Sequence, residues 1–229
     1  MVTVLSVGGS IVAPGAPDVD FLTRFNQMTR EVLAEDPARK LILVVGGGAP
    51  ARNYQKAYTA AAGETAVSAS EADWIGIMAT RLNAQLLRAL FSGLCKLDVV
   101  YDPTKVTEFP GRIMIAAGWK PGFSTDNDAV LLAERFAAKI VINISNIEKV
   151  YTDDPRVNPE AKPIDAISWA DFRKLVGDEW IPGKNTPFDP IASKYAQKTG
   201  ITVLCVGGKD MENIRKTLVG ERFFGTKIS

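Results

Sequence analysis

The chain has 229 residues, with 27 lysines and arginines balanced by 26 aspartates and glutamates, and its net charge is +1. Hydrophobic residues make up 46% of it and charged residues 23%, which is typical of a globular protein with a full core. The near-neutral charge gives no bulk attraction to nucleic acid or to an anionic membrane. The two cysteines, Cys95 and Cys205, have apolar neighbours, so we expect buried thiols and no disulfide.

Histidine is absent from the sequence. Its absence excludes Ser-His-Asp triads, zinc sites built on histidine and histidine general bases. Catalysis would therefore use carboxylates, lysines, arginines, backbone dipoles or a hard metal ion, and phosphoryl transfer fits because it relies on positioning and charge neutralisation. The first residues lead into a strand without a basic and apolar leader, and the apolar runs are too short for a membrane span, so we expect a cytoplasmic protein.

Taken in chain order, the first half of the sequence alternates between buried strands and amphipathic helices. Short apolar runs predict strands over residues 2–7, 41–45, 97–101 and 112–117. Helical periodicity predicts helices over residues 18–34, 49–62, 71–91 and 126–138. In the third of these helices a set of apolar residues recurs at spacings of three and four, which predicts a single core face. These residues are Ile75, Met78, Leu82, Leu86 and Leu90.

The second half of the sequence continues the alternation. Strands are predicted over residues 139–144 and 201–206, with an edge strand over 223–228, and helices over 169–176, 187–199 and 211–218. Proline-rich stretches at 153–163 and 178–190 predict surface loops. Since no repeat, low-complexity tract or long linker interrupts the pattern, we expect one α/β domain over residues 1–229. Its sheet would be mainly parallel and covered by helices on both faces.

Glycine clusters follow the first two strands, as Gly8-Gly9-Ser10 and Gly46-Gly47-Gly48. A third apolar run leads into the polar stretch 118–126. Backbone without Cβ atoms can approach a ligand closely, and the N–H groups after a strand can converge on an anion. Because parallel strands end at a common edge, these loops predict a site shaped around several phosphates.

Arg52 lies in the first turn of the helix after the second glycine cluster, where its guanidinium would hold a phosphate or simply face solvent. The spacing Gly46-x-Gly48-x-x-Ala51 also meets a loose dinucleotide pattern, but no acidic residue ends a second strand at the expected distance. We therefore favour phosphate binding over NAD binding.

The helix predicted over residues 71–91 has polar exceptions to its apolar pattern. Gly76 costs about 1 kcal/mol relative to alanine in a helix unless something approaches it closely. Asp73, Thr80 and Asn83 are each ordinary on a solvated face, but together with Gly76 they indicate a helix that faces a ligand.

Two more polar stretches follow predicted strands. In the stretch 121–126, one of Ser124, Thr125 and Asp126 would be a plain N-cap, yet three such residues after a proline-glycine turn also favour an anion at the helix start. The stretch 143–155 fits a purine-ribose site as well as it fits a polar turn with Tyr151 packed as a lid.

The chain carries these motifs in a definite order. They are Gly8-Gly9-Ser10, Gly46-Gly47-Gly48 with Arg52, Asp73-x-x-Gly76-x-x-x-Thr80-x-x-Asn83-Ala84, Pro121-Gly122-x-Ser124-Thr125-Asp126, and Ser145-Asn146-x-x-x-Val150-Tyr151-x-x-Asp154-Pro155. This order resembles the amino acid kinase superfamily and, within it, the short archaeal-type uridylate kinases, over nearly the whole chain.

The resemblance implies the three-layer α/β/α sandwich of amino acid kinases and carbamate kinase-like proteins. It implies phosphoryl transfer from ATP, with Mg²⁺, to UMP in pyrimidine nucleotide biosynthesis, by a homohexamer that has no nucleic-acid or membrane partner. An N-terminal lobe over about 1–138 would bind the acceptor nucleotide, and a C-terminal lobe over about 139–229 would bind ATP.

Site residues follow from the same resemblance. The ATP phosphates would contact Gly9, Ser10, Gly48 and Arg52, and the ATP base and ribose would contact Ser145, Asn146, Tyr151 and Asp154. The UMP site would comprise Gly47, Asp73, Gly76, Thr80, Lys120, Pro121, Gly122, Phe123, Ser124, Thr125 and Asp126. The catalytic set would be Arg52, Lys120, Asp126 and Lys184, with Asp126 orienting cations rather than abstracting a proton. No residue is assigned as a metal ligand.

The chain also departs from this family. Many relatives have a lysine just before the first glycine loop, where this chain has Ser6 and Val7. Charge neutralisation would then come from Arg52, Mg²⁺, Lys120 or Lys184. Residues 127–128, Asn-Asp, replace small apolar residues, and Lys120 stands where relatives often have histidine. Two alternatives therefore stay open: a kinase of this fold with another phosphate or carboxylate acceptor, and a nucleotide- or oxyanion-binding protein without turnover.

Overall fold

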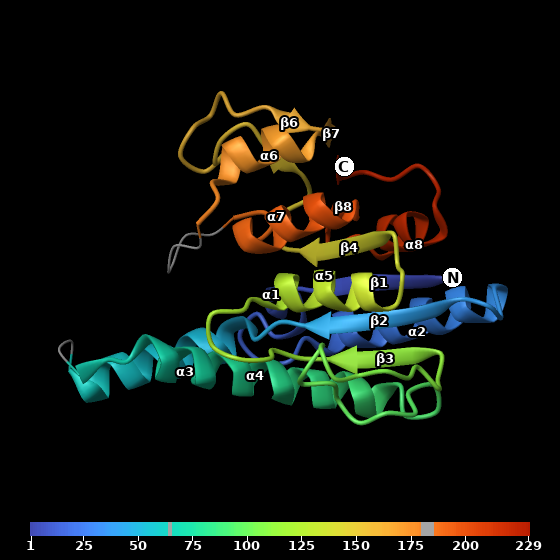
Figure 1. Cartoon of the computed structure of the whole chain (residues 1–229), viewed down its shortest axis with the longest axis horizontal. Coiled ribbons are helices and arrows are strands. Elements are labelled where there is room, and N and C mark those ends of the chain that lie inside the picture. Colours follow the sequence, from blue (N-terminus) through green and yellow to red (C-terminus); the bar gives the residue numbers. More distant parts are fainter. Residues whose placement is uncertain (64–65, 180–185) are drawn as a thin grey trace.

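The computed structural model describes residues 1–63, 66–179 and 186–229. Its strands are β1 (Val2–Val7), β2 (Lys40–Val45), β3 (Ile113–Ala116), β4 (Ile140–Ser145), β5 (Val150–Tyr151), β6 (Pro163–Ile164), β7 (Ala166–Ile167), β8 (Thr202–Gly207) and β9 (Thr226–Ile228). The main sheet has seven strands in the order β3-β2-β1-β4-β8-β9-β7, and β5 and β6 form a separate antiparallel pair (Figure 1). Within the main sheet only the β8–β9 pair is antiparallel among the described residues, so the sheet is mainly parallel.

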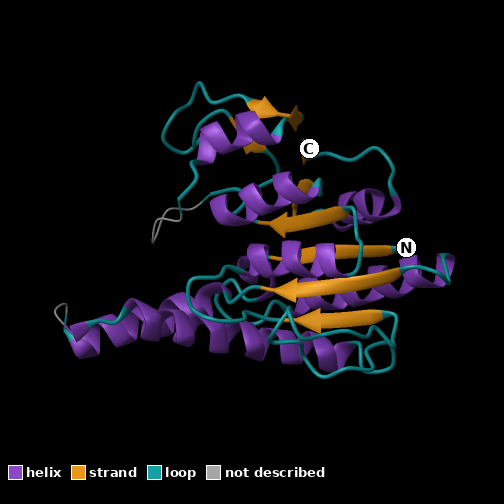
Figure 2. Cartoon of the chain, in the orientation of Figure 1, coloured by secondary structure: helices purple, strands orange, loops and turns teal. Residues whose placement is uncertain are grey.

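Helices cover both faces of this sheet. They are α1 (Gly9–Val12), α2 (Val19–Glu35), α3 (Gly48–Ala62), α4 (Ala69–Leu90), α5 (Thr125–Arg135), α6 (Trp169–Val176), α7 (Pro190–Thr199) and α8 (Met211–Val219). Figure 2 shows α5 in front of the strands and α2 behind them. The predicted three-layer α/β/α architecture is therefore confirmed.

The alternation of side chains along each strand divides the core into two clusters. Leu5 and Val7 of β1 belong to the cluster that packs against α2, α4 and α8. The side chain of Val4, the residue before Leu5, points to the opposite face and belongs to the cluster under α5, α6 and α7. Because successive side chains of a strand point to opposite faces, a strand buried on both sides must be apolar throughout. This is why the strands read as continuous apolar runs.

Side-chain caps fix where several helices begin. Asp18, Ser124 and Asp189 each accept a hydrogen bond from a backbone N–H in the first turn of α2, α5 and α7. Such a bond satisfies one of the N–H groups that a helix start leaves without a partner. Ser124 is thus the N-cap among the three candidates in its stretch, and Thr125 and Asp126 lie inside the first turn.

Some sequence predictions were wrong. Residues 97–101 form no named strand, and only an isolated bridge joins Val100 to Ala116. The C-terminal strand is limited to Thr226–Ile228 and lies between β8 and β7, so β7 is the edge instead. The short elements α1, β5, β6 and β7 were not predicted, because segments of two to four residues have too little periodicity to detect.

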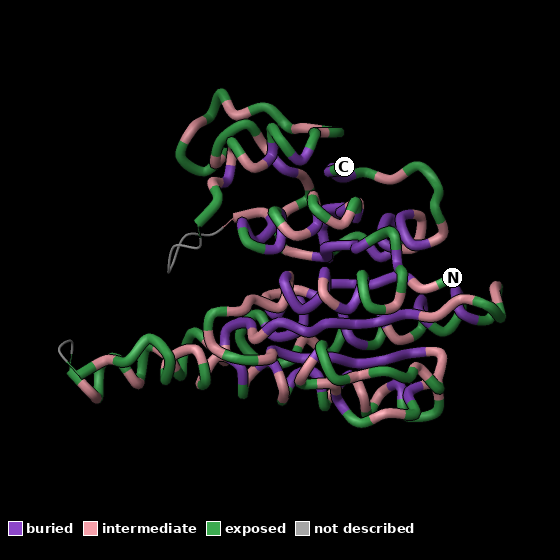
Figure 3. Tube along the Cα trace, in the orientation of Figure 1, coloured by how far each residue is buried: buried purple, intermediate pink, exposed green. Residues whose placement is uncertain are grey.

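The predicted core face of α4 was wrong in part, because Leu86 and Leu90 pack against the core but Met78 and Leu82 do not. Met78 is 58% exposed and Leu82 is 69% exposed, whereas the buried residues of the helix include Ile77, Ala84 and Leu87. Both stripes are apolar at helical spacing, and the sequence does not say which one meets the sheet. Figure 3 shows that α3 and the first part of α4 extend beyond the sheet edge, where most of their residues are exposed or half-buried.

Two further expectations can be compared with the structure. Cys95 and Cys205 are buried free thiols, as expected. No helix in residues 1–63, 66–179 and 186–229 has the length and apolar character needed to cross a bilayer. The division into an N-terminal and a C-terminal lobe stays a prediction, and β1 pairs with β4 in one continuous sheet across the proposed boundary.

A glycine substitution tests how tightly the sheet edge is packed. Gly48 has φ +67°, and a Cβ atom added to it would lie 2.3 Å from the carbonyl oxygen of Gly9. We expect Gly48→Ala to lower the free energy of unfolding by more than about 2 kcal/mol, because strain and overlap add. Gly15→Ala is the control, since a Cβ there would meet nothing within 4 Å. Urea unfolding measures both, and equal stabilities of the two variants would contradict the packing argument.

Candidate active site

The carboxyl ends of β1, β2, β3 and β4 meet at one edge of the sheet, where the predicted loops lie (Figure 1). The two glycine loops cross there in direct backbone contact. The Gly46 N–H donates to the Val7 carbonyl oxygen, and a Cβ atom on Gly9 would lie 2.0 Å from the Gly48 nitrogen. The glycines are therefore required by this crossing, whether or not a ligand also approaches them.

Helix α4 holds these loops from one side. Asn83 is buried and donates from Nδ2 to the carbonyl oxygens of Gly46 and Gly47, at 2.8 and 3.2 Å. Its amide thus fixes the second glycine loop. The sequence did not reveal this role, because a polar residue on a helix gives the same pattern whether it contacts a ligand or backbone. A Cβ on Gly76 would lie 2.8 Å from Gln55 Nε2, at the end of a flexible side chain of α3, so this contact does not by itself require a glycine.

Residues 118–124, which we call the Trp119 loop, follow β3 and precede α5. Thr80 Oγ1 accepts the Gly118 N–H at 2.8 Å, and Asp73 Oδ2 accepts the Gly122 N–H at 2.9 Å. Asp73 and Thr80 therefore touch the predicted Pro121-Gly122 turn region. Asp73 and Thr80 lie two turns apart on α4, so the helix contacts the loop at two points.

Aromatic rings shape the outer part of the Trp119 loop. The Trp119 and Phe123 ring centroids are 4.9 Å apart. The Lys120 ammonium lies 4.0 Å from the Trp119 centroid and 4.9 Å from the Phe123 centroid, while Lys120 itself is exposed. Cation–π attraction thus holds a solvent-facing positive charge over this loop.

Asp126 lies at the centre of the site and joins separate elements. Its Oδ1 accepts the hydroxyl proton of Ser6 on β1 at 2.8 Å, and its Oδ2 accepts the Asp189 N–H at the start of α7 at 3.2 Å. Burial raises the pKa of Asp126 to about 6, opposed by the Ser6 hydrogen bond and reinforced by the Asp189 charge. Ser6, at the position of the missing lysine, is therefore a site residue that the sequence marked only by that absence.

Asp128 is a second buried carboxylate, one half-turn farther along α5, and it was not among the predicted site residues. It is 1% exposed, and its Oδ2 accepts the Trp119 N–H at 3.2 Å. Burial raises the pKa of Asp128 to about 7, reinforced by the charges of Asp126 and Asp102.

A hollow of about 160 Å³ lies beside the end of β4. It is lined by Ser145, Asn146, Glu148, Gly207, Gly208, Lys209, Asp210, Asn213 and Phe224. Two of the four residues predicted for the ATP base and ribose, Ser145 and Asn146, line this hollow. The segment 207–210, which begins at the last residue of β8, lines it too and had not been predicted, because its Gly-Gly-Lys-Asp sequence is also typical of an ordinary turn.

The other two residues predicted for the base and ribose lie outside that lining. Tyr151 is on β5. Asp154 accepts hydrogen bonds from the backbone and guanidinium of Arg156, and these bonds lower the pKa of Asp154 to about 2. The Asp154 carboxylate is therefore already paired within its own loop.

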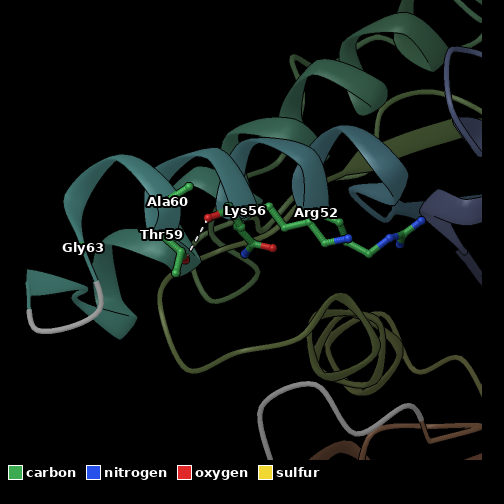
Figure 4. Close-up of a pocket in the computed structure, with 6 residues that line it drawn as sticks. Arg52, Lys56, Thr59, Ala60 and Gly63 are labelled. Carbon is green, nitrogen blue, oxygen red and sulfur yellow. Dashed lines mark hydrogen bonds between the residues drawn. The ribbon is translucent and has the colours of Figure 1, made fainter.

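Arg52 lines a second, open hollow of about 520 Å³ along the exposed side of α3. The rest of its lining is Gln55, Lys56, Thr59, Ala60 and Gly63. Figure 4 shows the Arg52 side chain extending away from Gly63, toward the start of the helix and the glycine loops. No hydrogen bond or ion pair within residues 1–63, 66–179 and 186–229 engages its guanidinium, which leaves it available to an anion. Lys184 lies outside the described residues.

Comparison with known proteins identifies the family of this chain. Its residues 1–207 match the amino acid kinase family. This chain belongs to that family. The uridylate kinase of Methanospirillum hungatei JF-1 is 34% identical over 235 residues, which cover 99% of this chain and 94% of that protein. The uridylate kinase of Pyrococcus abyssi is 35% identical over 211 residues, which cover 90% of each chain.

Solved structures of similar proteins have the same fold. The uridylate kinase structure from Archaeoglobus fulgidus superposes with a TM-score of 0.84 at 32% identity, and the match covers 100% of both chains. The UMP kinase structure from Bacillus anthracis, at 18% identity and a TM-score of 0.77, shares the fold. The resemblance inferred from the order of motifs is thereby confirmed.

The raised pKa of Asp128 predicts a pH-dependent stability. In the folded protein Asp128 keeps its proton up to about pH 7, whereas its ordinary pKa is 3.8. Its favourable contribution is therefore complete below pH 3.8 and is lost as the pH rises through 7. Asp128→Asn stays neutral, so we expect its stability relative to wild type to rise between pH 4 and 7, by at most about 1.4 kcal/mol per pH unit.

Urea unfolding at intervals between pH 4 and 8 measures this difference. Glu212→Gln is a matched control, because it removes an exposed carboxylate from the first turn of α8, a helix that packs against α2, β4 and β8. Parallel stability curves for wild type and Asp128→Asn would show that Asp128 does not titrate in this window.

Proposed function

We propose that this protein is a uridylate kinase that transfers the γ-phosphoryl group of ATP to UMP. The observation that carries the proposal is the meeting of the two crossed glycine loops, the Trp119 loop and Asp126 at one sheet edge. Near-full-length similarity to proteins named uridylate kinase supports UMP as the acceptor. Neither an acceptor of another class nor a protein without turnover is favoured by these relatives.

ATP and UMP would occupy opposite sides of the crossing. The ATP phosphates would lie against Gly9, Ser10 and Gly48, with the Arg52 guanidinium beside them. The ATP base and ribose would occupy the hollow lined by Ser145 and Asn146. We keep Tyr151 and Asp154 as proposed neighbours of the base.

UMP would lie between α4 and the Trp119 loop. Gly47 would contact its phosphate, and Asp73 would bind its ribose through Oδ1, since Oδ2 already accepts the Gly122 N–H. Thr80 and Gly76 would act through the loops they contact. Pro121, Gly122, Phe123, Ser124 and Thr125 would form the rest of the acceptor site.

Transfer would proceed by direct in-line displacement. An oxygen of the UMP phosphate forms a bond to the γ-phosphorus as the bond to the β–γ bridging oxygen breaks, which gives UDP and ADP. The acceptor oxygen already carries charge, so no general base is required, in agreement with a chain that lacks histidine. Asp126, held by Ser6 and the Asp189 N–H, would orient cations, while Arg52 and Lys120 neutralise charge on the phosphates. Lys184 is a further candidate for that role.

Mg²⁺ fits this site as a companion of ATP. In residues 1–63, 66–179 and 186–229, no group of three or more His, Cys, Asp or Glu side chains is placed to hold a metal ion. Mg²⁺ commonly keeps several waters and binds through substrate phosphates with one or two carboxylates, so the single carboxylate of Asp126 is a sufficient protein contribution. The ion would supply charge neutralisation at the phosphates.

Self-association is part of the proposal. Trp74, Met78 and Leu82 form an exposed apolar stripe on α4, and such a stripe commonly marks an interface. It supports an oligomer, for which we propose the hexamer implied by the family, in the cytoplasm. Sedimentation velocity measures the state, and a monomer at micromolar concentration would contradict it.

The acceptor is tested by coupled ADP release with Mg²⁺-ATP and a panel of UMP, CMP, dUMP, GMP and AMP. We expect strong preference for UMP, because the relatives that match along nearly their whole length are named for it. A folded protein that binds ATP but turns over no nucleotide would contradict the proposed function.

The role of Arg52 is tested by Arg52→Ala. Loss of a preorganised cation at the transferred phosphate should lower kcat/KM by roughly 100-fold with little change in stability. Arg24→Ala is the control, because Arg24 makes only an exposed ion pair with Asp20 on α2. Near-wild-type kcat/KM for Arg52→Ala would remove Arg52 from the mechanism.

A further inference from the structure

The backbone of the Trp119 loop is held by side chains from two different helices. From α4, Thr80 accepts the Gly118 N–H, Arg81 donates to the Gly118 and Trp119 carbonyl oxygens, and Asp73 accepts the Gly122 N–H. From α5, Asp128 accepts the Trp119 N–H. The loop therefore bridges α4 and α5, and Asp128 contributes a side-chain hydrogen bond from α5 in addition to the Ser124 cap.

Burial of the Asp128 carboxyl group lowers the stability of the folded protein. Its Oδ1 is buried and has no hydrogen-bond partner in the part of the chain that the structure describes. The charged groups that act on it, Asp126 on its own helix and Asp102 in the loop after Val100, are both acidic. A buried carboxylate with an unpaired oxygen beside like charges is unfavourable compared with an apolar side chain of similar size. The one hydrogen bond obtained in return is that to Trp119.

That hydrogen bond is also one of the contacts that set the position of a positive charge. With its N–H fixed, Trp119 places its indole ring under the Lys120 ammonium, 4.0 Å from the ring centroid. Phe123 packs against the same indole. A shift of the Trp119 backbone would therefore move Lys120, one of the cations available to the phosphates.

We propose that Asp128 is a positioning residue of the acceptor site, which fixes the Trp119 loop, and with it Lys120, by accepting the Trp119 N–H. This inference rests on the proposed function only in that it takes the Trp119 loop as the acceptor site. Asp128 itself touches no substrate in this scheme.

Two substitutions separate the hydrogen bond from the charge. Asp128→Asn keeps a carbonyl oxygen for the Trp119 N–H and removes the charge, whereas Asp128→Val removes both. We expect Asp128→Val to raise the KM for UMP by about tenfold, the size of one lost hydrogen bond to a buried donor, with the KM for ATP within about twofold of wild type. Asp128→Asn should stay within about twofold of wild type in both constants.

Stability provides a readout that separates positioning from a merely structural role. Because it removes a buried carboxylate, Asp128→Val should melt no lower than wild type while binding UMP more weakly. A merely structural role would make stability and UMP binding fall together. If Asp128→Val does not fold, Asp128→Ala carries the same expectations. The control Glu212→Gln should change neither constant.

The loop can also be observed without substrate. In protein labelled with ¹⁵N-tryptophan, hydrogen exchange of the Trp119 amide, assigned with Trp119→Phe, should be slow in wild type and Asp128→Asn. It should be at least about tenfold faster in Asp128→Val, since an amide without its acceptor is free to exchange. This measurement decides the inference even if UMP is not the substrate.

The outcomes are distinct. If wild type turns over UMP, the proposed function stands. The inference is then overturned if Asp128→Val leaves the KM for UMP unchanged, or if Asp128→Asn is impaired as strongly as Asp128→Val. Unchanged Trp119 exchange in Asp128→Val would overturn it as well. Faster exchange in Asp128→Val alone, with no turnover of UMP by wild type, would support the positioning of the loop and contradict the proposed function.

Discussion

The backbone crossing of the two glycine loops is the constraint on which the rest of the site depends. A Cβ atom on Gly9 or Gly48 would overlap the other loop's backbone, at 2.0 and 2.3 Å. The ends of β1 and β2 can therefore approach only as bare backbone, and this approach sets the start of α3 and the place of Arg52. Anion binding by the same loops requires no additional feature, because N–H groups at strand ends already converge there.

Helix α4 connects the crossed glycine loops to the Trp119 loop. Its buried side chains Asn83 and Thr80 hold the second glycine loop and the Trp119 loop, so one rigid element sets the distance between them. Its opposite face carries the apolar residues that remain exposed, Met78 and Leu82. A helix with both faces apolar can bind the sheet on one side and another surface on the other, which is why α4 matters for both the site and assembly.

Charge is arranged unequally across the site. Asp128 is buried and Asp126 is half-buried, and burial raises the pKa of both carboxyl groups toward neutrality. The cations Arg52 and Lys120 are exposed, and among the described residues the Lys120 ammonium contacts the aromatic faces of Trp119 and Phe123. A site whose acids are enclosed and whose bases are accessible favours polyanionic ligands, even though the whole chain is close to neutral.

The sequence by itself determined the α/β alternation, the mainly parallel sheet and the order of motifs, because buried strands and capped helices leave periodic patterns that need no knowledge of neighbours. It also singled out Asp73, Thr80 and Asp126 as candidate site residues, since polar residues at strand ends and on one helix are visible as exceptions. Only the tertiary structure decided which apolar stripe of α4 is buried and that Asn83 binds loop backbone. It also revealed Ser6 and Asp128 as partners of Asp126 and Trp119. Those contacts join residues from distant parts of the chain, such as the 120 positions between Ser6 and Asp126, and no local pattern encodes them.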